Sequence, residues 1–164
     1  MTEQPMTGSA RAVPEQQAQT LGAQKLANRV VRGLLRTPLL CRVAGGRLVT
    51  LYVVGRKSGR RYVVPVAYTK ADGDLLIGTP FGWGRNLRTG EPLTIRLKGR
   101  LREADVQVYS TEADVTRAYS AMVRDNGTFA KFNKISIDAA GQPNPSDLHR
   151  VWAGGARAFR LTPR

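Results

Sequence analysis

The alternation of apolar and polar positions predicts a chain built mainly from short β-strands. Runs rich in β-branched residues recur at residues 47–54, 62–69, 75–79, 92–97, 100–109 and 156–161. In residues 92–97 the alternation is strict, with Leu93, Ile95 and Leu97 on one side, which is typical of a half-buried strand. Short turns join most of these runs, including an Asp-Gly pair within residues 71–74. The pattern predicts an antiparallel meander that closes on itself as a small barrel.

Helical periodicity predicts two helices in the C-terminal third of the chain. The first follows a Thr111 cap, carries an apolar stripe through Val115, Ala118, Tyr119 and Met122, and ends at residues 126–127. A second, short helix is expected at residues 146–152. Between them, residues 128–144 show no period and are expected to be irregular, with Phe129 and Phe132 as anchors. The fold class is therefore mainly β with flanking helices.

The N-terminal segment divides into two parts by composition. Residues 1–20 are rich in Gln, Ala, Pro and Thr without an apolar period, which predicts a mobile tail. Residues 21–35 have an apolar stripe opposed by cations, which predicts an amphipathic helix that Pro38 stops. That helix would pack as a lid over the sheet, or lie on an anionic membrane. The expected domain spans residues 21–164.

A strong excess of positive charge indicates an anionic partner. The 164 residues include 26 Lys and Arg against 12 Asp and Glu, for a formal net charge of +14 and an isoelectric point near 11.0. Nucleic acid, an acidic membrane surface and a phosphorylated small molecule all meet this requirement. Cys41 is the single cysteine, so no internal disulfide forms, and a reducing cytoplasm is expected. We find no secretory leader and no apolar run long enough to span a bilayer.

The loop between the first two predicted strands carries the clearest candidate chemistry. Glycines at positions 55 and 59 enclose Arg56, Lys57 and Ser58, and Arg60 and Arg61 follow. Backbone amides, a hydroxyl and several cations on a rigid hairpin would form a cradle for an anion. His149 is expected to be a surface or capping residue. One His and one Cys also supply too few ligands for a metal site.

The run Gly-Arg-Lys-Ser-Gly between two strands, Pro65 in the second strand, and Trp83 with Asn86 and Leu87 after the next strand resemble the deazaflavin-dependent nitroreductases. These are actinobacterial reductases with a split β-barrel of the pyridoxamine-phosphate-oxidase type. The resemblance implies binding of coenzyme F420 and hydride transfer from its reduced form to an electron-poor acceptor. That acceptor would be a quinone, an activated alkene or a nitro compound.

The resemblance also implies a set of cofactor-binding residues. Arg56, Lys57, Ser58 and Gly59 would contact the phosphate region, and Arg60 or Arg61 would reach the anionic tail. Pro65 and Val66 would lie near the ring. The ring or its linker would be bordered by Trp83, Asn86 and Leu87, with added charge from Arg85. The resemblance gives no role to Tyr119, Phe129 or Phe132, and no catalytic side chain is assigned.

Several alternatives remain open at the level of the sequence. FMN is the alternative ligand of the same barrel. A non-enzymatic basic barrel that binds nucleic acid or an anionic membrane is the rival from another class, although no nucleic-acid-binding signature is present. Homodimerisation would bury further apolar surface. Residues 21–35 would place the protein at the inner face of the cell membrane.

Overall fold

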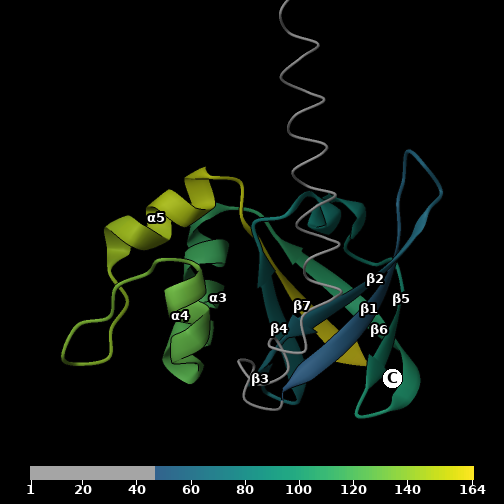
Figure 1. The fold of residues 1–164 in the computed structure, drawn as a ribbon, viewed down its shortest axis with the longest axis horizontal. Helices are drawn as coiled ribbons and strands as arrows, with labels where there is room; N and C mark the ends of the chain where they lie inside the picture. Colours follow the sequence, from purple (N-terminus) through teal and green to yellow (C-terminus); the bar gives the residue numbers. More distant parts are fainter. Residues whose placement is uncertain (1–46) are drawn as a thin grey trace, which may run out of the picture. The chain divides into compact units, whose positions relative to one another are not determined.

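The computed structural model describes residues 47–164. The predicted tail, the predicted helix at residues 21–35 and Cys41 all lie outside the described residues. Within residues 47–164 the chain forms one seven-stranded antiparallel sheet and three α-helices (Figure 1). The mainly β fold class predicted from the sequence is therefore confirmed.

All the predicted strands are present, but their order in the sheet is not that of a meander. The strands are β1 (Leu48–Val54), β2 (Arg61–Ala67), β3 (Thr69–Ala71), β4 (Asp74–Thr79), β5 (Leu93–Leu97), β6 (Arg100–Tyr109) and β7 (Arg157–Pro163). Their spatial order is β2-β1-β5-β6-β7-β4-β3. The hairpins β1–β2, β3–β4 and β5–β6 follow the sequence, whereas β5 returns to pair with β1 and β7 inserts between β6 and β4. The meander prediction was wrong because turn signals specify hairpins but do not specify how one hairpin meets the next.

The sheet is curled into a half-barrel, and Tyr68 shows why. The two edge strands, β2 and β3, are separated in sequence by Tyr68 alone. In a flat seven-stranded sheet the edges would lie about 29 Å apart, whereas the two steps from Ala67 to Thr69 span at most about 7 Å. The sheet must therefore curl until its two edges approach each other at this corner. Tyr68 is buried there, and its amide donates to the carbonyl oxygen of Arg47 at 3.1 Å.

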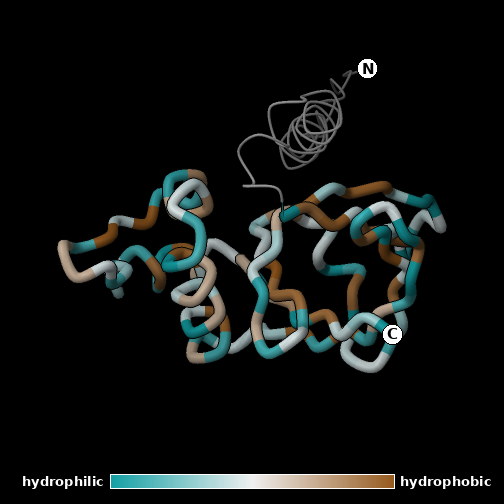
Figure 2. Tube along the Cα trace, turned by 90° about the horizontal axis from the view of Figure 1, so that it is seen from below, coloured by the Kyte–Doolittle hydropathy of each residue, from teal (hydrophilic) through white to brown (hydrophobic). Residues whose placement is uncertain are grey.

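Strand alternation places the main core inside the curl. Val49, Leu51 and Val53 of β1 are almost fully buried and pack with Ile95 and Phe159, among others. The intervening positions of β1 point away from this core and are more exposed. Figure 2 shows the hydrophobic positions recurring along the strands. This alternation gives the sheet an inner face and an outer face, as a half-barrel requires.

The helices form a second core against one end of the sheet. They are α3 (Glu112–Asp125), α4 (Gly127–Phe132) and α5 (Pro145–Ala153). Thr111 caps α3 as predicted, since its side chain accepts from the amide of Asp114. The prediction that residues 128–144 are wholly irregular was wrong, because the side chain of Asn126 caps a further helix, α4. α3 packs against β3, β4 and β7, which leaves β1, β2 and β5 at the other end of the sheet.

In the part of the chain that the structure describes, no helix combines the length and apolarity needed to cross a membrane.

Candidate functional site

The loop between β1 and β2 (residues 55–60), together with Arg61 at the start of β2, is held by hydrogen bonds within the segment. We call it the cationic loop. The amide of Gly55 donates to the carbonyl oxygen of Arg60 at 2.7 Å, and the amide of Gly59 donates to the carbonyl oxygen of Gly55 at 2.7 Å. Gly59 has a φ of 63°, which glycine adopts without strain. The amide of Arg60 donates to Oγ of Ser58 at 3.3 Å.

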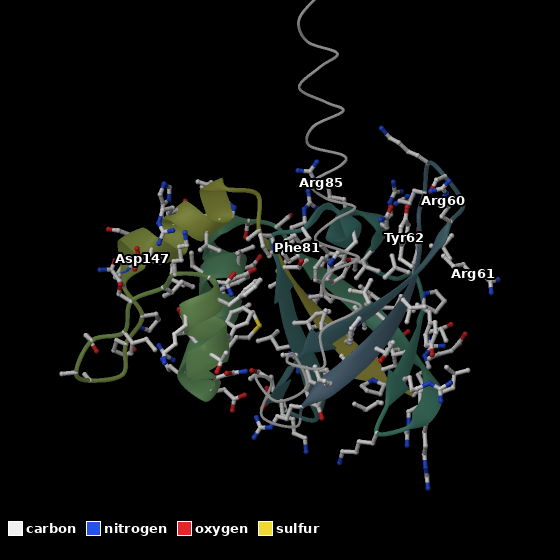
Figure 3. The ribbon with its side chains drawn as sticks, in the orientation of Figure 1. Arg60, Arg61, Tyr62, Phe81, Arg85 and Asp147 are labelled. Atoms are coloured by element: carbon white, nitrogen blue, oxygen red, sulfur yellow. The ribbon has the colours of Figure 1, made fainter. Side chains whose placement is uncertain are left out.

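These bonds change what the loop can offer an anion. The amides of Gly55, Gly59 and Arg60 are already used inside the loop, so the predicted cradle of backbone amides is largely occupied by the loop itself. The cationic side chains remain exposed, and Figure 3 shows Arg60 and Arg61 extending from the hairpin into solvent. An anion at this loop would therefore be held chiefly by guanidinium and ammonium groups.

Asn86 fastens the cationic loop to the neighbouring 3₁₀ helix η1 (Gly82–Asn86). Its Oδ1 accepts from the amide of Arg56 at 3.1 Å, and its Nδ2 donates to the carbonyl oxygen of Trp83 at 3.0 Å. Residues 82–86 form a single helical turn. Because one amide side chain bonds both segments, the loop cannot move independently of η1 without breaking one of these bonds.

Glycine at position 84 sets how closely η1 approaches the core. A Cβ atom added to Gly84 would lie 2.7 Å from Cγ2 of Thr79 and 3.1 Å from the ring of Phe159. Real Cβ atoms essentially never come within 3.0 Å of such neighbours, so the packing requires glycine here. The close approach brings Asn86 within reach of the cationic loop.

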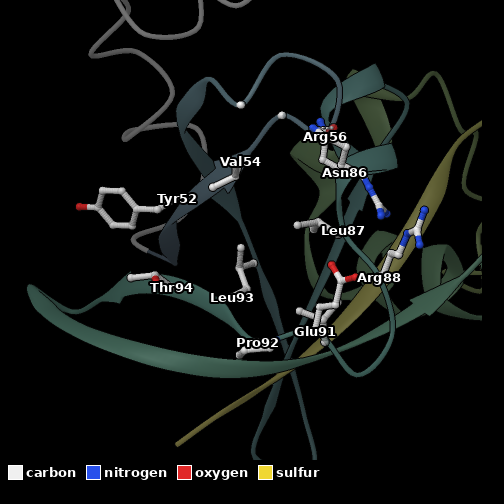
Figure 4. A pocket seen from close by; sticks show the side chains of 13 residues that line it. Tyr52, Val54, Arg56, Asn86, Leu87, Arg88, Glu91, Pro92, Leu93 and Thr94 are labelled. Carbon is white, nitrogen blue, oxygen red and sulfur yellow. Dashed lines mark hydrogen bonds between the residues drawn. The ribbon is translucent and has the colours of Figure 1, made fainter.

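A cavity of about 500 Å³ opens beside the cationic loop, where β1 and β5 separate (Figure 4). The pairing of the two strands ends at Leu51 opposite Ile95. Continuing the register would place Val54 opposite Pro92, and proline has no amide hydrogen to donate to a partner strand. Residues 52–54 and 92–94 are not paired with each other, and the cavity lies beside them.

The lining combines an apolar floor with a charged rim. It consists of Tyr52, Val54, Gly55, Arg56, Gly59, Asn86, Leu87, Arg88, Glu91, Pro92, Leu93, Thr94 and Val106. Leu87, Leu93 and Val106 belong to the buried core, whereas Arg56, Arg88 and Glu91 are exposed. An apolar cavity with a few charged groups at one side suits a flat ring that carries an anionic substituent.

The positive charge of the rim is not neutralised by the described residues. The ion pairs within residues 47–164 involve Arg47, Arg117, His149, Arg150, Arg160 and Arg164. These pairs leave out the cations of the cationic loop and of residues 85–102. Glu91 is the single acid in the lining, against Arg56 and Arg88. The field at the cavity mouth is therefore positive and would attract an anionic ligand.

The structure brings some of the predicted binding residues to the cavity and leaves others away from it. Those that line it are Arg56, Gly59, Asn86 and Leu87. Lys57, Ser58, Arg60 and Arg61 lie on the same loop but outside the lining.

The remaining four predicted residues lie outside the cavity lining. Val66 and Trp83 pack against the core, and the ring of Trp83 stacks on Phe159 with centroids 6.4 Å apart. Pro65 pairs with Thr50, a position on the side of β1 opposite the core. The guanidinium of Arg85 lies near Gly155 rather than at the cavity.

Sequence reasoning missed one wall of the cavity, formed by residues 91–94. The signal was available in Pro92, which stands where the strand pattern of residues 92–97 begins and cannot donate a backbone hydrogen bond to a partner strand. What the sequence could not supply was the pairing of β5 with β1, because these strands are not consecutive. Without that neighbour, the proline indicates only a strand start.

The other candidate side chains lie among the helices. His149 is exposed, and its Nδ1 lies 2.6 Å from Glu112 Oε1. Trp152 donates from Nε1 to the carbonyl oxygen of Ser110 at 3.1 Å, which is a packing role. Within residues 47–164, no three His, Cys, Asp or Glu side chains gather closely enough to hold a metal ion.

Comparison with known proteins gives distant structural likenesses alone. Neither a protein-family model nor a curated protein matches the chain. Among solved structures, the chain is similar to the crystal structure of a conserved hypothetical protein from Mycobacterium tuberculosis, with a TM-score of 0.46 and 14% sequence identity. The match covers 74% of this chain and 76% of that one. The function proposed below therefore rests on the geometry of the loop and the cavity.

Proposed function

We propose that the protein is a reductase that binds a deazaflavin of the coenzyme F420 type and transfers its hydride to an electron-poor acceptor. The fold would be the split barrel of the pyridoxamine-phosphate-oxidase type. The observation that carries the proposal is the bond between Arg56 and Asn86, because it holds beside a cavity a row of cations that form no ion pair with other described residues. The acceptor would be a quinone, an activated alkene or a nitro compound.

The size and chemistry of the site support this ligand class. Ligand cavities generally measure about 300–1,000 Å³, and the cavity of about 500 Å³ falls inside that range. Leu87 and Leu93 offer apolar contact for a ring, and Arg56, Lys57 and Arg88 offer positive charge for a phosphate and carboxylates. In such enzymes the cofactor supplies the hydride. The residues of this chain bind the anionic handle, orient the ring and exclude water from its apolar side.

FMN is the second ligand that suits the same arrangement, since it also joins a flat ring to a phosphate. A direct comparison separates the two. The full-length protein is mixed with either reduced F420 or reduced FMN and with excess benzoquinone, and oxidation of the cofactor is followed by its absorbance. The proposal predicts that the protein accelerates oxidation of the deazaflavin above the rate of the uncatalysed reaction. The proposal would be contradicted if the protein accelerated the oxidation of FMN but not of F420, or if it accelerated the oxidation of neither cofactor.

A further inference from the structure

The outer face of β1, β2, β5 and β6 carries several exposed apolar side chains, with Thr50 and Arg96 lying between those of β2 and that of β6. The three most exposed are Val54 at 54%, Val63 at 46% and Leu101 at 59%. The strand registers place them on the side opposite the core, with Val63 beside Tyr52 and Leu101 beside Arg96. We call this group, with Pro65, the outer apolar patch. Exposed apolar groups that gather in this way mark interaction surfaces more often than scattered ones do.

Cations stand at both ends of the outer apolar patch. At one end Arg61 lies directly opposite Val54 across the β1–β2 pair, beside the rest of the cationic loop. At the other end Arg96 lies opposite both Thr50 and Leu101. Arg96 is held in place there, since its Nε donates to the hydroxyl oxygen of Tyr52 at 3.1 Å. Lys98 and Arg100 add two further cations at the same end.

We propose that the outer apolar patch is a docking surface for an anionic lipid bilayer. Aliphatic side chains would enter the boundary between headgroups and acyl chains, and the cations at both ends would contact anionic headgroups. Each cation near such a surface contributes roughly 1 kcal/mol. Tyr52 presents a half-buried ring with a polar end, which is the amphipathic character favoured at membrane interfaces.

Charge argues against the two other occupants that could cover this face. A second copy of the chain would bring cations over cations, because both ends of the patch are positive and Glu103 is the nearby acid. Single-stranded nucleic acid would satisfy the charge, but its bases stack on exposed aromatic rings. The three most exposed side chains of the patch are aliphatic.

Val54 of the patch and Tyr52, which lies beside Val63 of the patch, both line the cavity, so the cavity opens toward the proposed bilayer. A lipid-soluble acceptor could therefore enter the cavity without crossing bulk water. The bilayer contact itself does not depend on the cofactor or on the proposed reaction. It can be tested on the protein without any added redox ligand.

The test compares matched variants of the full-length protein by co-sedimentation with vesicles. The vesicles contain either phosphatidylcholine with phosphatidylglycerol or phosphatidylcholine alone. The double variant Val63→Ser with Leu101→Ser removes the apolar contact, and Ile137→Ser is the control, because Ile137 is 41% exposed on another segment. We expect wild type and Ile137→Ser to bind the anionic vesicles alike and the double variant to bind about tenfold more weakly.

A second variant, Arg61→Gln, keeps the test independent of any folding defect in the first. We expect it to bind anionic vesicles about fivefold more weakly, and Lys131→Gln on α4 to bind like wild type. Wild-type binding retained in both patch variants would overturn the proposal, and so would a wild type that ignores anionic vesicles. A double variant that binds vesicles normally but loses self-association in light scattering would assign the face to a second copy. A double variant that loses only DNA binding would assign it to nucleic acid.

Discussion

The amide of Arg56 donates to Oδ1 of Asn86 at 3.1 Å, which joins two segments that lie thirty residues apart in sequence. The same Asn86 side chain donates to the carbonyl oxygen of Trp83. The first strand, the cationic loop and η1 therefore act as one rigid wall beside the cavity. This wall holds Arg56 beside the cavity, where we propose that the phosphate of the ligand binds.

Replacing Asn86 should loosen that wall and weaken ligand binding. Asn86→Ala removes two hydrogen bonds, each worth about 1 kcal/mol net, so we expect the free energy of unfolding to fall by about 1–2 kcal/mol. Because the loop then loses its fixed position, binding of the deazaflavin should weaken about tenfold. Urea unfolding and calorimetric titration measure the two effects. A variant that binds as tightly as wild type would show that Asn86 does not position the loop.

The two glycines of η1 should differ sharply in their tolerance of alanine. A Cβ at Gly84 would lie 2.7 Å from the side chain of Thr79, whereas a Cβ at Gly82 would meet nothing within 4 Å. We therefore expect Gly84→Ala to lower the free energy of unfolding by about 1–3 kcal/mol and Gly82→Ala to change it by less than about 0.5 kcal/mol. Equal effects would mean that η1 does not pack closely on the core. Thermal melts of the two variants provide the comparison.

Removing the hydroxyl of Tyr119 should stabilise the protein. This oxygen is buried and has no hydrogen-bond partner among the described residues. Burial raises the pKa of the Tyr119 hydroxyl, so the group stays neutral throughout the ordinary pH range. Leaving a buried polar group unpaired costs about 1–3 kcal/mol, so Tyr119→Phe should raise the free energy of unfolding by about 1 kcal/mol in urea. Tyr109→Phe is the control, because its hydroxyl bonds to Gln107, and a loss of stability in Tyr119→Phe would contradict the prediction.

The carboxylate of Asp147 should make stability depend on pH in the acid range. The amide of Ser136, followed by the Arg150 guanidinium, lowers the pKa of Asp147 to about 2. In the unfolded chain the pKa of Asp is about 3.9. A lowered folded pKa means that the stabilisation is complete above about pH 4 and is lost as the pH falls toward 2.

Melting temperatures measured at several pH values test this sign. The melting temperature of wild type should exceed that of Asp147→Ala at pH 6, and this difference in melting temperature should shrink steadily as the pH falls from 4 to 2. A difference that stays constant or grows over that range would show that the ionised carboxylate is not the source of the effect.

Local patterns along the chain predicted the strands and the helix cap well, but they did not predict which strands pair with each other in the sheet. The Thr111 cap and the Asp-Gly turn each involve residues within four positions of one another, so a short stretch of sequence is enough to predict them. The pairing of β5 with β1 joins residues more than forty positions apart, and no local signal specifies it. The cavity depends on that pairing, which is why the loop side of the site could be predicted and the wall at residues 91–94 could not.

The cationic loop shows a second limit of local patterns. Its glycines and cations were correctly placed between two strands, but nothing in their pattern indicated that the backbone amides would bond within the loop. The amides of Gly55, Gly59 and Arg60 donate to acceptors within the loop. The exposed cationic side chains therefore supply most of what the loop offers an anion, and the most direct test changes charge.

That test is a calorimetric titration of wild type and Arg56→Ala with F420 and with the bare deazaflavin riboside, which lacks the phosphate and the carboxylates. Lys131→Ala, a charge change on α4, is the control. If the cationic loop holds the anionic handle, wild type and the control will bind F420 at least tenfold more tightly than the riboside, and Arg56→Ala will lose most of that preference. Equal affinity of wild type for the two ligands, or an undiminished preference in Arg56→Ala, would contradict the central claim.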